Sequence, residues 1–279
     1  MAFKASKVRQ KKAPAPVGRG SPIIPSFALE SWYRKQMASL LTSMIEDYKK
    51  ELSAEGKTYE AKQLFGTDAS ATSGFTRTLN SLRQRWSGIF EAFADKLAPE
   101  FVEKVDGQAT SATLHSLSVA GLKAPVATYS AAVANTLQAS VTYNHTLITG
   151  ISSEVHEKIF GSVMLSLTSP NPEEQGMSGI HSALQKVGIS EKKRIDLIAR
   201  DQTSKIYSAL SDNRMEDNGC EEFEWLHSSA GKVPRHTHVE KDGLIFKLND
   251  PRLWEGPKAD QGPPGWAINC RCRKVPVFR

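Results

Sequence analysis

Apolar residues recur at three- and four-residue steps through much of residues 26–210, which is the spacing of one face of a helix. A first stripe consists of Met37, Leu40, Leu41, Met44, Ile45, Tyr48 and Leu52. A second stripe consists of Phe75, Leu79, Leu82, Trp86, Ile89, Phe90, Phe93 and Leu97. Both stripes predict helices that pack on a core or on one another. Pro99 follows the second stripe and is expected to end that helix.

The middle of the chain also favours helix, with interruptions. Residues 106–145 are rich in Ala, Ser, Thr and Val, and a break is expected near Lys123–Pro125. Helical spacing resumes in residues 147–167. A proline-containing turn then leads to a short helix that is expected to end at Gly188, and another helix begins at Ser190.

The pattern changes after about residue 218. Short segments with strand-like residues, "CEEFEWLHS", "HTHVEKDGLIFKLND" and "INCRCRKVPVF", are separated by turn-forming stretches. The Asp242-Gly243 pair predicts a tight turn that joins two strands as a hairpin. The sequence therefore predicts an α+β protein with a mostly helical N-terminal body and a small β-containing C-terminal module. The expected division is a tail at residues 1–25, a helical region at 26–217 and the module at 218–279.

The excess charge is confined to the N-terminus. The first 22 residues hold six of the 36 basic residues and no acidic residue, so the rest of the chain has 30 of each sign. The basic residues are Lys4, Lys7, Arg9, Lys11, Lys12 and Arg19. Such a tail, which we expect to be disordered, is attracted to nucleic acid or to an acidic partner surface. The alternative interpretation is a solubilising leader.

The composition also excludes some classes of protein. The chain lacks the roughly 18 consecutive apolar residues that a membrane-spanning helix needs, so no membrane span is expected. Its N-terminus has no apolar signal core. Three cysteines are too few for a disulfide framework, which favours free thiols in a reducing compartment.

Two close pairs, His236 with His238 and Cys270 with Cys272, are candidate metal ligands. On a strand, residues two apart face the same side, so two paired strands would bring four zinc ligands together. Cys-x-Cys is less diagnostic of zinc than Cys-x-x-Cys. The competing interpretation is that the cysteines are buried core residues on the last strand, with the neighbouring arginines facing outward.

A nuclease is a further alternative. His227, His236 and His238 together with Arg235 could transfer protons or stabilise a phosphate. However, the sequence pairs them with no positioned nucleophile or carboxylate. We therefore expect no catalytic residue and no enzyme activity.

A series of motifs runs in order through the last ninety residues. It comprises Ala199-Arg200, Gly219, Trp225, Arg235, His238, Asp242-Gly243, Pro263-Pro264-Gly265, Asn269, Cys270, Arg271 and Cys272. This series resembles the phage Mu F-like minor head proteins, also called phage head morphogenesis proteins. The resemblance covers roughly residues 190–279 and extends more weakly back to Asn144. Two positions depart from the family pattern: Gln202 stands where relatives often have an acid, and Ala267 or Ile268 where they often have His.

The resemblance implies a function and partners. It indicates a minor capsid protein of a tailed bacteriophage, found in the virion and assembled in the host cytoplasm. Portal, capsid or scaffold proteins are the implied partners, and the basic tail is a candidate contact for packaged DNA. The chain ends directly after the Cys-Arg-Cys motif, so no C-terminal enzymatic extension is expected. A phage-delivered nuclease or toxin and a zinc-stabilised adaptor are the alternatives, and no cofactor other than zinc is considered.

Overall fold

A computed structural model describes residues 18–64, 71–229 and 234–279. Its long helices are α1 (Phe27–Leu64), α2 (Ala71–Val119), α3 (Ala131–Thr168) and α4 (Gly176–Asp217). The shorter elements are β1 (Gly18–Arg19), β2 (Glu222–Leu226), α5 (His236–Glu240), β3 (Ile245–Lys247), two 3₁₀ turns (Pro251–Trp254 and Lys258–Asp260) and β4 (Arg273–Phe278). The expected α+β class is confirmed, with a helical body and a small sheet near the C-terminus.

The chain forms two compact units. The helical unit comprises Pro25–Gln108 and Ala131–Tyr207. The sheet unit comprises Ala109–Ser130 and Ser208–Arg279, together with the described residues up to Ile24. The sheet unit is thus assembled from three stretches of sequence, and it differs from the expected module at 218–279, because it also includes the ends of α2 and α4.

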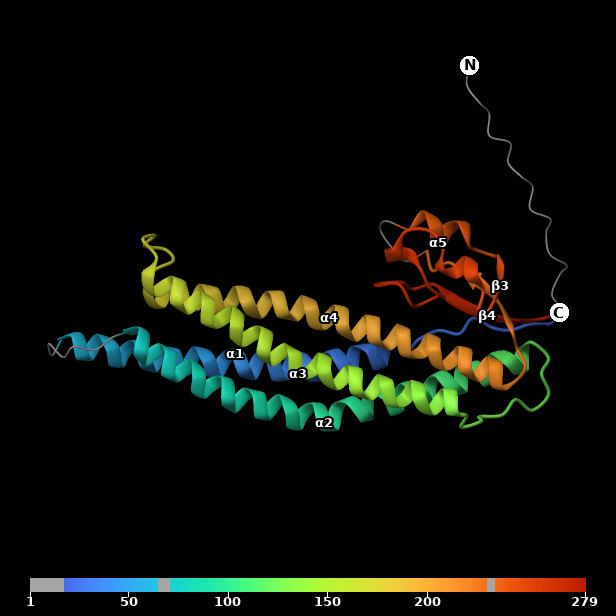
Figure 1. The fold of residues 1–279 in the computed structure, drawn as a ribbon, viewed down its shortest axis with the longest axis horizontal. Helices are drawn as coiled ribbons and strands as arrows, with labels where there is room; N and C mark the ends of the chain where they lie inside the picture. Colours follow the sequence, from blue (N-terminus) through green and yellow to red (C-terminus); the bar gives the residue numbers. More distant parts are fainter. Residues whose placement is uncertain (1–17, 65–70, 230–233) are drawn as a thin grey trace, which may run out of the picture. The chain divides into compact units, whose positions relative to one another are not determined.

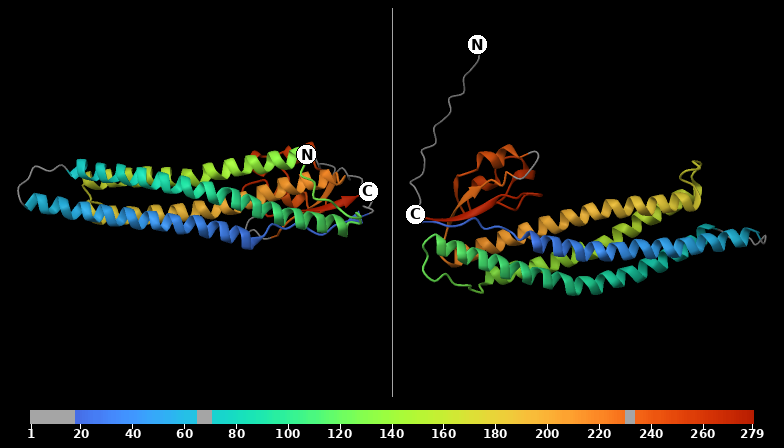
Figure 2. Two further views of the ribbon diagram at one scale, coloured as in Figure 1. Left: turned by 90° about the horizontal axis from the view of Figure 1, so that it is seen from below. Right: turned by 180° about the vertical axis from the view of Figure 1, so that it is seen from behind.

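The helical unit is a bundle of four helices that lie side by side (Figures 1 and 2). Tyr33 of α1 stacks on Phe101 of α2 with ring centroids 3.7 Å apart. The Tyr33 hydroxyl donates to the side-chain oxygen of Asn144 on α3 at 3.0 Å, and the Asn144 amide donates to Gln202 on α4 at 3.3 Å. Buried polar groups need partners, so this chain of hydrogen bonds links three helices through the core.

Most residues of the two predicted stripes face this core, but Ile89 is 39% exposed, and Leu40, Ile45 and Phe93 are only partly buried. Met37, Leu41, Met44, Tyr48 and Leu52 are fully buried along α1, as the spacing predicts. A matching series on α2 consists of Phe75, Leu79, Leu82, Trp86, Phe90 and Leu97. Each helix buries one repeating face, which is how most helical stability arises in a folded protein.

Two expected helix ends are wrong. Helix α2 continues through Pro99, although an internal proline removes a backbone hydrogen bond and costs about 3 kcal/mol. Leu97 and Phe101, buried on either side, offset that cost. Helix α4 likewise continues through Gly188, because an internal glycine costs only about 1 kcal/mol relative to alanine.

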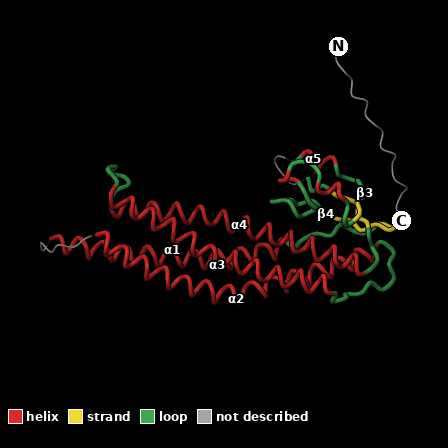
Figure 3. Tube along the Cα trace, viewed as in Figure 1, coloured by secondary structure: helices red, strands yellow, loops and turns green. Residues whose placement is uncertain are grey.

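The sheet has four antiparallel strands in the order β1-β4-β2-β3 (strands yellow in Figure 3). β2 pairs along its whole length with β4, from Glu222 opposite Val277 to Leu226 opposite Arg273. Phe223 and Trp225 alternate with half-buried neighbours on β2, as expected of a strand with one covered face.

The N-terminal boundary also differs from the expectation. Arg19 lies opposite Val277 in the sheet, and the Ile23 amide donates to the Lys274 carbonyl at 2.9 Å. The sequence analysis assigned residues 18–25 to the tail. Residues 18–24 instead belong to the sheet unit, and Pro25 begins the helical unit. Among the described helices, none combines the length and the apolar character needed to cross a membrane.

Candidate functional site

The centre of the sheet unit is built around Trp225 on β2. Its side chain is fully buried and meets the His238 ring edge-on, with centroids 5.1 Å apart. Phe246 of β3 lies against the same indole, with centroids 6.1 Å apart. The Trp225 ring therefore forms the apolar wall beside which the polar side chains gather.

His238 comes from the one-turn helix α5. The expected hairpin is wrong here, because "HTHVE" forms this helix and not a strand. Successive helical residues are rotated by about 100°, so residues two apart face almost opposite directions. His238 is accordingly buried and His236 is exposed. His236 is thus not a partner of His238 in one ligand set.

Cys270 and Cys272 precede the last strand, which begins at Arg273. The expectation that both lie on that strand is wrong. A turn closed by the Cys270 amide and the Ala267 carbonyl at 2.8 Å places them, and Asn269 has a positive φ of 62° within it. Asn tolerates this left-handed conformation better than most residues. Both cysteines are nevertheless buried, at 3% and 5% exposed, as the core interpretation predicted.

The three side chains converge. The His238 Nδ1 atom lies 3.5 Å from the Cys270 Sγ and 3.7 Å from the Cys272 Sγ. One ligand atom from each residue lies within 4.8 Å of the other two. All three cysteines of the chain are free, so no disulfide competes for these sulfurs. The arrangement is a buried set of one imidazole and two thiols.

The orientation of the imidazole is fixed from outside the cluster. Its Nε2 atom lies 2.9 Å from the Asp260 carbonyl oxygen, which can only accept, so Nε2 carries a proton. Asp260 is held in turn by an ion pair with Arg235 at 2.8 Å and a hydrogen bond from Thr237 at 2.8 Å. Arg235 also donates to the Ile268 carbonyl at 2.7 Å. Arg235 therefore positions both α5 and the loop that carries the cysteines.

The two thiols titrate as a coupled pair. Hydrogen bonding from Cys272, with help from His238 and the Gly265 amide, lowers the pKa of Cys270 in spite of burial. The same contact with Cys270, together with burial, raises the pKa of Cys272. The site therefore favours a state in which one of the two cysteines is a thiolate and the other is a thiol whose proton is hydrogen-bonded between the two sulfurs.

Two basic side chains at the site have shifted pKa values. Burial acts to lower the pKa of His238, but the hydrogen bonds to Cys270 and the Asp260 carbonyl raise it overall. Burial lowers the pKa of Lys241, whose Nζ lies over the Trp225 ring at 5.2 Å from its centroid. Positive charge next to the sulfurs stabilises thiolate there.

The other motif residues of the sheet unit make backbone contacts. An Asp242 carboxylate oxygen accepts from the His227 amide at 2.7 Å. Gly243 has a positive φ of 74°, and its amide donates to the Trp225 carbonyl at 2.8 Å. Asp242-Gly243 therefore forms the tight turn that was predicted, but it connects α5 to β3. Arg271 uses its carbonyl to accept from the Arg273 side chain.

Arg200 does not belong to this set. It lies on α4 in the helical unit, where its Nε is 3.7 Å from a Glu30 carboxylate oxygen. Gln202, the position that departs from the family pattern, is buried in the same unit and accepts from Asn144. These two residues thus contribute to packing in the bundle.

A buried charged group was missed by the sequence analysis. Lys274 on β4 is 3% exposed, pairs with Asp212 at the end of α4, and donates to the Ser208 hydroxyl at 2.8 Å. Burial lowers the pKa of Lys274 and raises that of Asp212. The only signal in the sequence was a lysine within an apolar strand, since a lysine there requires a partner.

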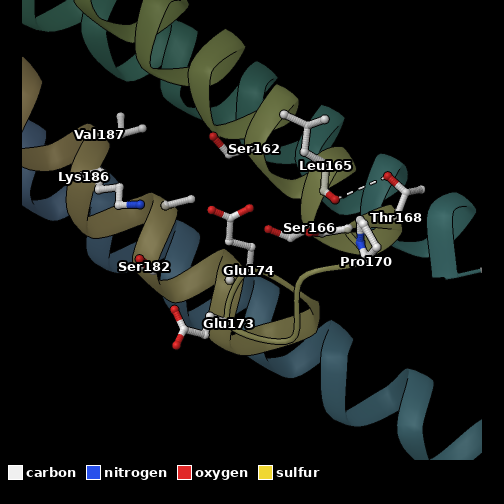
Figure 4. Close-up of a pocket in the computed structure, with 13 residues that line it drawn as sticks. Ser162, Leu165, Ser166, Thr168, Pro170, Glu173, Glu174, Ser182, Lys186 and Val187 are labelled. Carbon is white, nitrogen blue, oxygen red and sulfur yellow. Dashed lines mark hydrogen bonds between the residues drawn. The ribbon is translucent and has the colours of Figure 1, made fainter.

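A separate cavity of about 490 Å³ lies between the end of α3 and the start of α4 in the helical unit. Figure 4 shows Glu174 reaching from the connecting loop into the space between the two helices, with Ser162 and Ser182 on opposite sides. Its lining is mostly small hydroxyl-bearing and apolar side chains. The His238 cluster is therefore the stronger chemical site.

The basic tail is only partly described. Lys4, Lys7, Arg9, Lys11 and Lys12 lie outside the described residues. Arg19, placed in the same set from the sequence, instead forms a two-point contact with Glu224 of β2, at 2.7 Å and 3.0 Å.

Comparison with known proteins agrees with the resemblance found in the sequence. Residues 173–275 match the family described as Phage Mu protein F like protein. An uncharacterized protein of Haemophilus influenzae is 27% identical over 260 residues, which cover 92% of this chain and 55% of that protein. The chain thus spans about half the length of this relative. No solved structure matches the chain.

Proposed function

Since residues 173–275 form a Phage Mu protein F like region, we propose that this protein acts in head morphogenesis of a tailed bacteriophage as a minor capsid protein associated with the portal. The family match carries the proposal. It extends from the loop before α4 into β4, so it includes the whole His238 cluster and the Arg235 contacts that position it. The proposed location is the virion, after assembly in the host cytoplasm.

The geometry of the cluster supports a role other than catalysis. His238, Cys270 and Cys272 are each at most 5% exposed, whereas a nucleophile or a general base has to reach its substrate. His236, part of the nuclease alternative, is exposed on α5 while His238 faces the sulfurs. The described residues thus offer no observation that favours a nuclease over an assembly protein.

Co-purification tests the proposal. The full chain, tagged and expressed from its own phage genome, is expected to elute with the portal protein and to be present in mature particles. A phage lacking the gene is expected to yield fewer DNA-filled heads. Absence of the protein from both portal complexes and particles would contradict the proposal.

We extend the proposal to packaged DNA, on the basis of the charge of the N-terminus. Five basic residues, Lys4, Lys7, Arg9, Lys11 and Lys12, precede Arg19 without an intervening acid. Each phosphate contact contributes about 0.9 to the slope of log K against log salt concentration. Changing all five to Gln is therefore expected to reduce that slope by up to about 4 to 5 in a DNA-binding titration.

Arg19 supplies the matched control. Because it is bound to Glu224, Arg19→Gln is expected to leave the salt slope unchanged. An unchanged slope in the five-residue variant would remove DNA contact from the proposal and would leave the portal association standing.

A further inference from the structure

The spacing of the three buried ligand atoms matches the coordination shell of a zinc ion. Typical bonds are about 2.3 Å from zinc to sulfur and about 2.0–2.1 Å from zinc to imidazole nitrogen. In a tetrahedron these lengths separate a nitrogen from a sulfur by roughly 3.5–3.6 Å. The observed separations of His238 Nδ1 from the two sulfurs are 3.5 Å and 3.7 Å. An ion therefore fits with only a small movement of the side chains.

The imidazole presents the correct nitrogen. Because Nε2 donates its proton to the Asp260 carbonyl at 2.9 Å, the neutral ring has its lone pair on Nδ1, which faces the sulfurs. Histidines that bind metals are commonly held by such a contact on their other nitrogen. Arg235 and Thr237 fix Asp260 from the opposite side. This supporting network orients the ring before any ion binds.

One of the two sulfurs also has a backbone donor directed at it. The Gly265 amide points at the Cys270 Sγ at 3.4 Å, and the positive φ of 88° at Gly265 is a conformation that other residues rarely adopt. A backbone amide that points at a sulfur is the kind of contact that supports a metal-bound thiolate.

Charge balance favours a divalent ion in this setting. When an ion binds, both thiols release their protons, and the two thiolates with a neutral imidazole then carry a charge of minus two, which a zinc ion neutralises. Unpaired charge is costly inside a protein, and the three side chains are almost inaccessible to water. Sulfur and imidazole ligands together select zinc over magnesium or calcium, which prefer oxygen.

We propose that His238, Cys270 and Cys272 bind one zinc ion, with a solvent molecule in the fourth position. The ion joins α5 to the segment that leads into β4, and its role is to stabilise the sheet unit. That unit has a five-residue helix and a three-residue strand near the site. Small folds with little regular structure often depend on a metal for stability. His236, a fourth candidate from the sequence, is not a ligand.

Metal analysis of the full chain tests the proposal. Protein purified without chelator is expected to contain one zinc ion per chain. Cys272→Ser and His238→Ala are each expected to lose it. Cys220→Ser is the matched control, because Cys220 is equally buried in the sheet unit but contacts the Glu222 and Val277 carbonyls. Zinc that is absent from the wild-type chain, or that the ligand variants retain, would overturn the proposal.

Cobalt substitution gives a readout that does not depend on the folding of any variant. Cobalt added to the metal-free wild-type chain is expected to produce sulfur-to-cobalt charge-transfer absorption that saturates at one equivalent and is reversed by zinc. Zinc-edge X-ray absorption is expected to show two sulfur and two nitrogen or oxygen neighbours. Absence of the charge-transfer band would mean that the cluster is a hydrogen-bonded core without metal. Neither result bears on association with the phage head, which is tested separately.

Discussion

The helical unit and the sheet unit reach stability by different means. In the helical unit, one apolar face is repeated over several turns, as in the fully buried series from Met37 to Leu52 on α1. In the sheet unit the elements are short, and polar groups such as Lys274 and His238 occupy central positions. The first unit distributes its stabilisation over many similar contacts. The second concentrates it in a few groups, each of which must remain paired.

Polar groups are buried in both units, but their charged members are paired differently. Glu191 of the bundle is fully buried, yet its partners Lys158 and Arg194 are 40% and 30% exposed. The Tyr33, Asn144 and Gln202 side chains of the bundle are neutral, and each hydrogen bond contributes about 1 kcal/mol. In the sheet unit Lys274 and Asp212 form a buried ion pair. Removing one member of a buried pair costs more than removing a neutral hydrogen bond, since it leaves an uncompensated charge. We therefore expect the largest single-residue effects in the sheet unit.

The substitution Asp212→Leu is expected to destabilise the sheet unit by about 3–5 kcal/mol, because it leaves the Lys274 ammonium buried without its counter-charge. Adding Lys274→Met is expected to restore most of that loss, since an apolar pair of similar size needs no partner. Urea unfolding of the wild type, the two single variants and the double variant measures the coupling.

Lys247→Met is the matched control for this cycle. Lys247 lies on β3 of the same sheet but is exposed, so its change is expected to stay within about 0.5 kcal/mol. A double variant no more stable than Asp212→Leu would show that the two units do not differ in the way described.

The same contrast explains how much of the fold was predictable. The stripes on α1 and α2 were predicted because helical periodicity is local and repeats many times. The errors at Pro99 and Gly188 arose where tertiary packing outweighed a local preference of about 1–3 kcal/mol. The break between α2 and α3 was predicted near Lys123–Pro125, and the structure has it at residues 120–130.

The candidate site was predicted in part. The motif order identified Trp225, Arg235, His238, Cys270 and Cys272, and these residues converge. The sequence could not show that "HTHVE" is a helix, because five residues carry too little periodicity to distinguish it from a strand. That error made His236 a ligand candidate. The contribution of Asp260 was also missed, because it acts through its backbone carbonyl, which any residue offers.

The helical unit is expected to lose stability in mild acid through His156. Its Nδ1 lies 3.0 Å from the Tyr48 hydroxyl, and burial, aided by Arg83 and opposed by Glu157, lowers the pKa of the ring. In the unfolded chain a histidine titrates near 6.5, so protons bind preferentially to the unfolded state. Stability is therefore complete above about pH 6.5 and is expected to fall by up to about 1.4 kcal/mol at pH about 5.5.

Denaturant unfolding at several pH values measures this slope, with His156→Gln expected to reduce it. His181→Gln is the control, because His181 is only half buried and pairs with Ser53. If His156→Gln keeps the full slope, the acid sensitivity of the bundle has another source.

The smallest expected effect concerns the one described residue of the basic tail. The Arg19 side chain is 49% exposed, and its two-point contact with Glu224 reaches across β4 to β2. Exposed ion pairs contribute about 0–1 kcal/mol, so Arg19→Ala is expected to lower the stability of the sheet unit by less than about 1 kcal/mol.

The loss should diminish further in high salt, which screens surface charges but not a buried pair such as Lys274 with Asp212. Thermal unfolding of Arg19→Ala and Asp212→Leu at low and high salt separates the two cases. An equally salt-insensitive loss in both would show that the Arg19–Glu224 contact does not behave as an exposed ion pair.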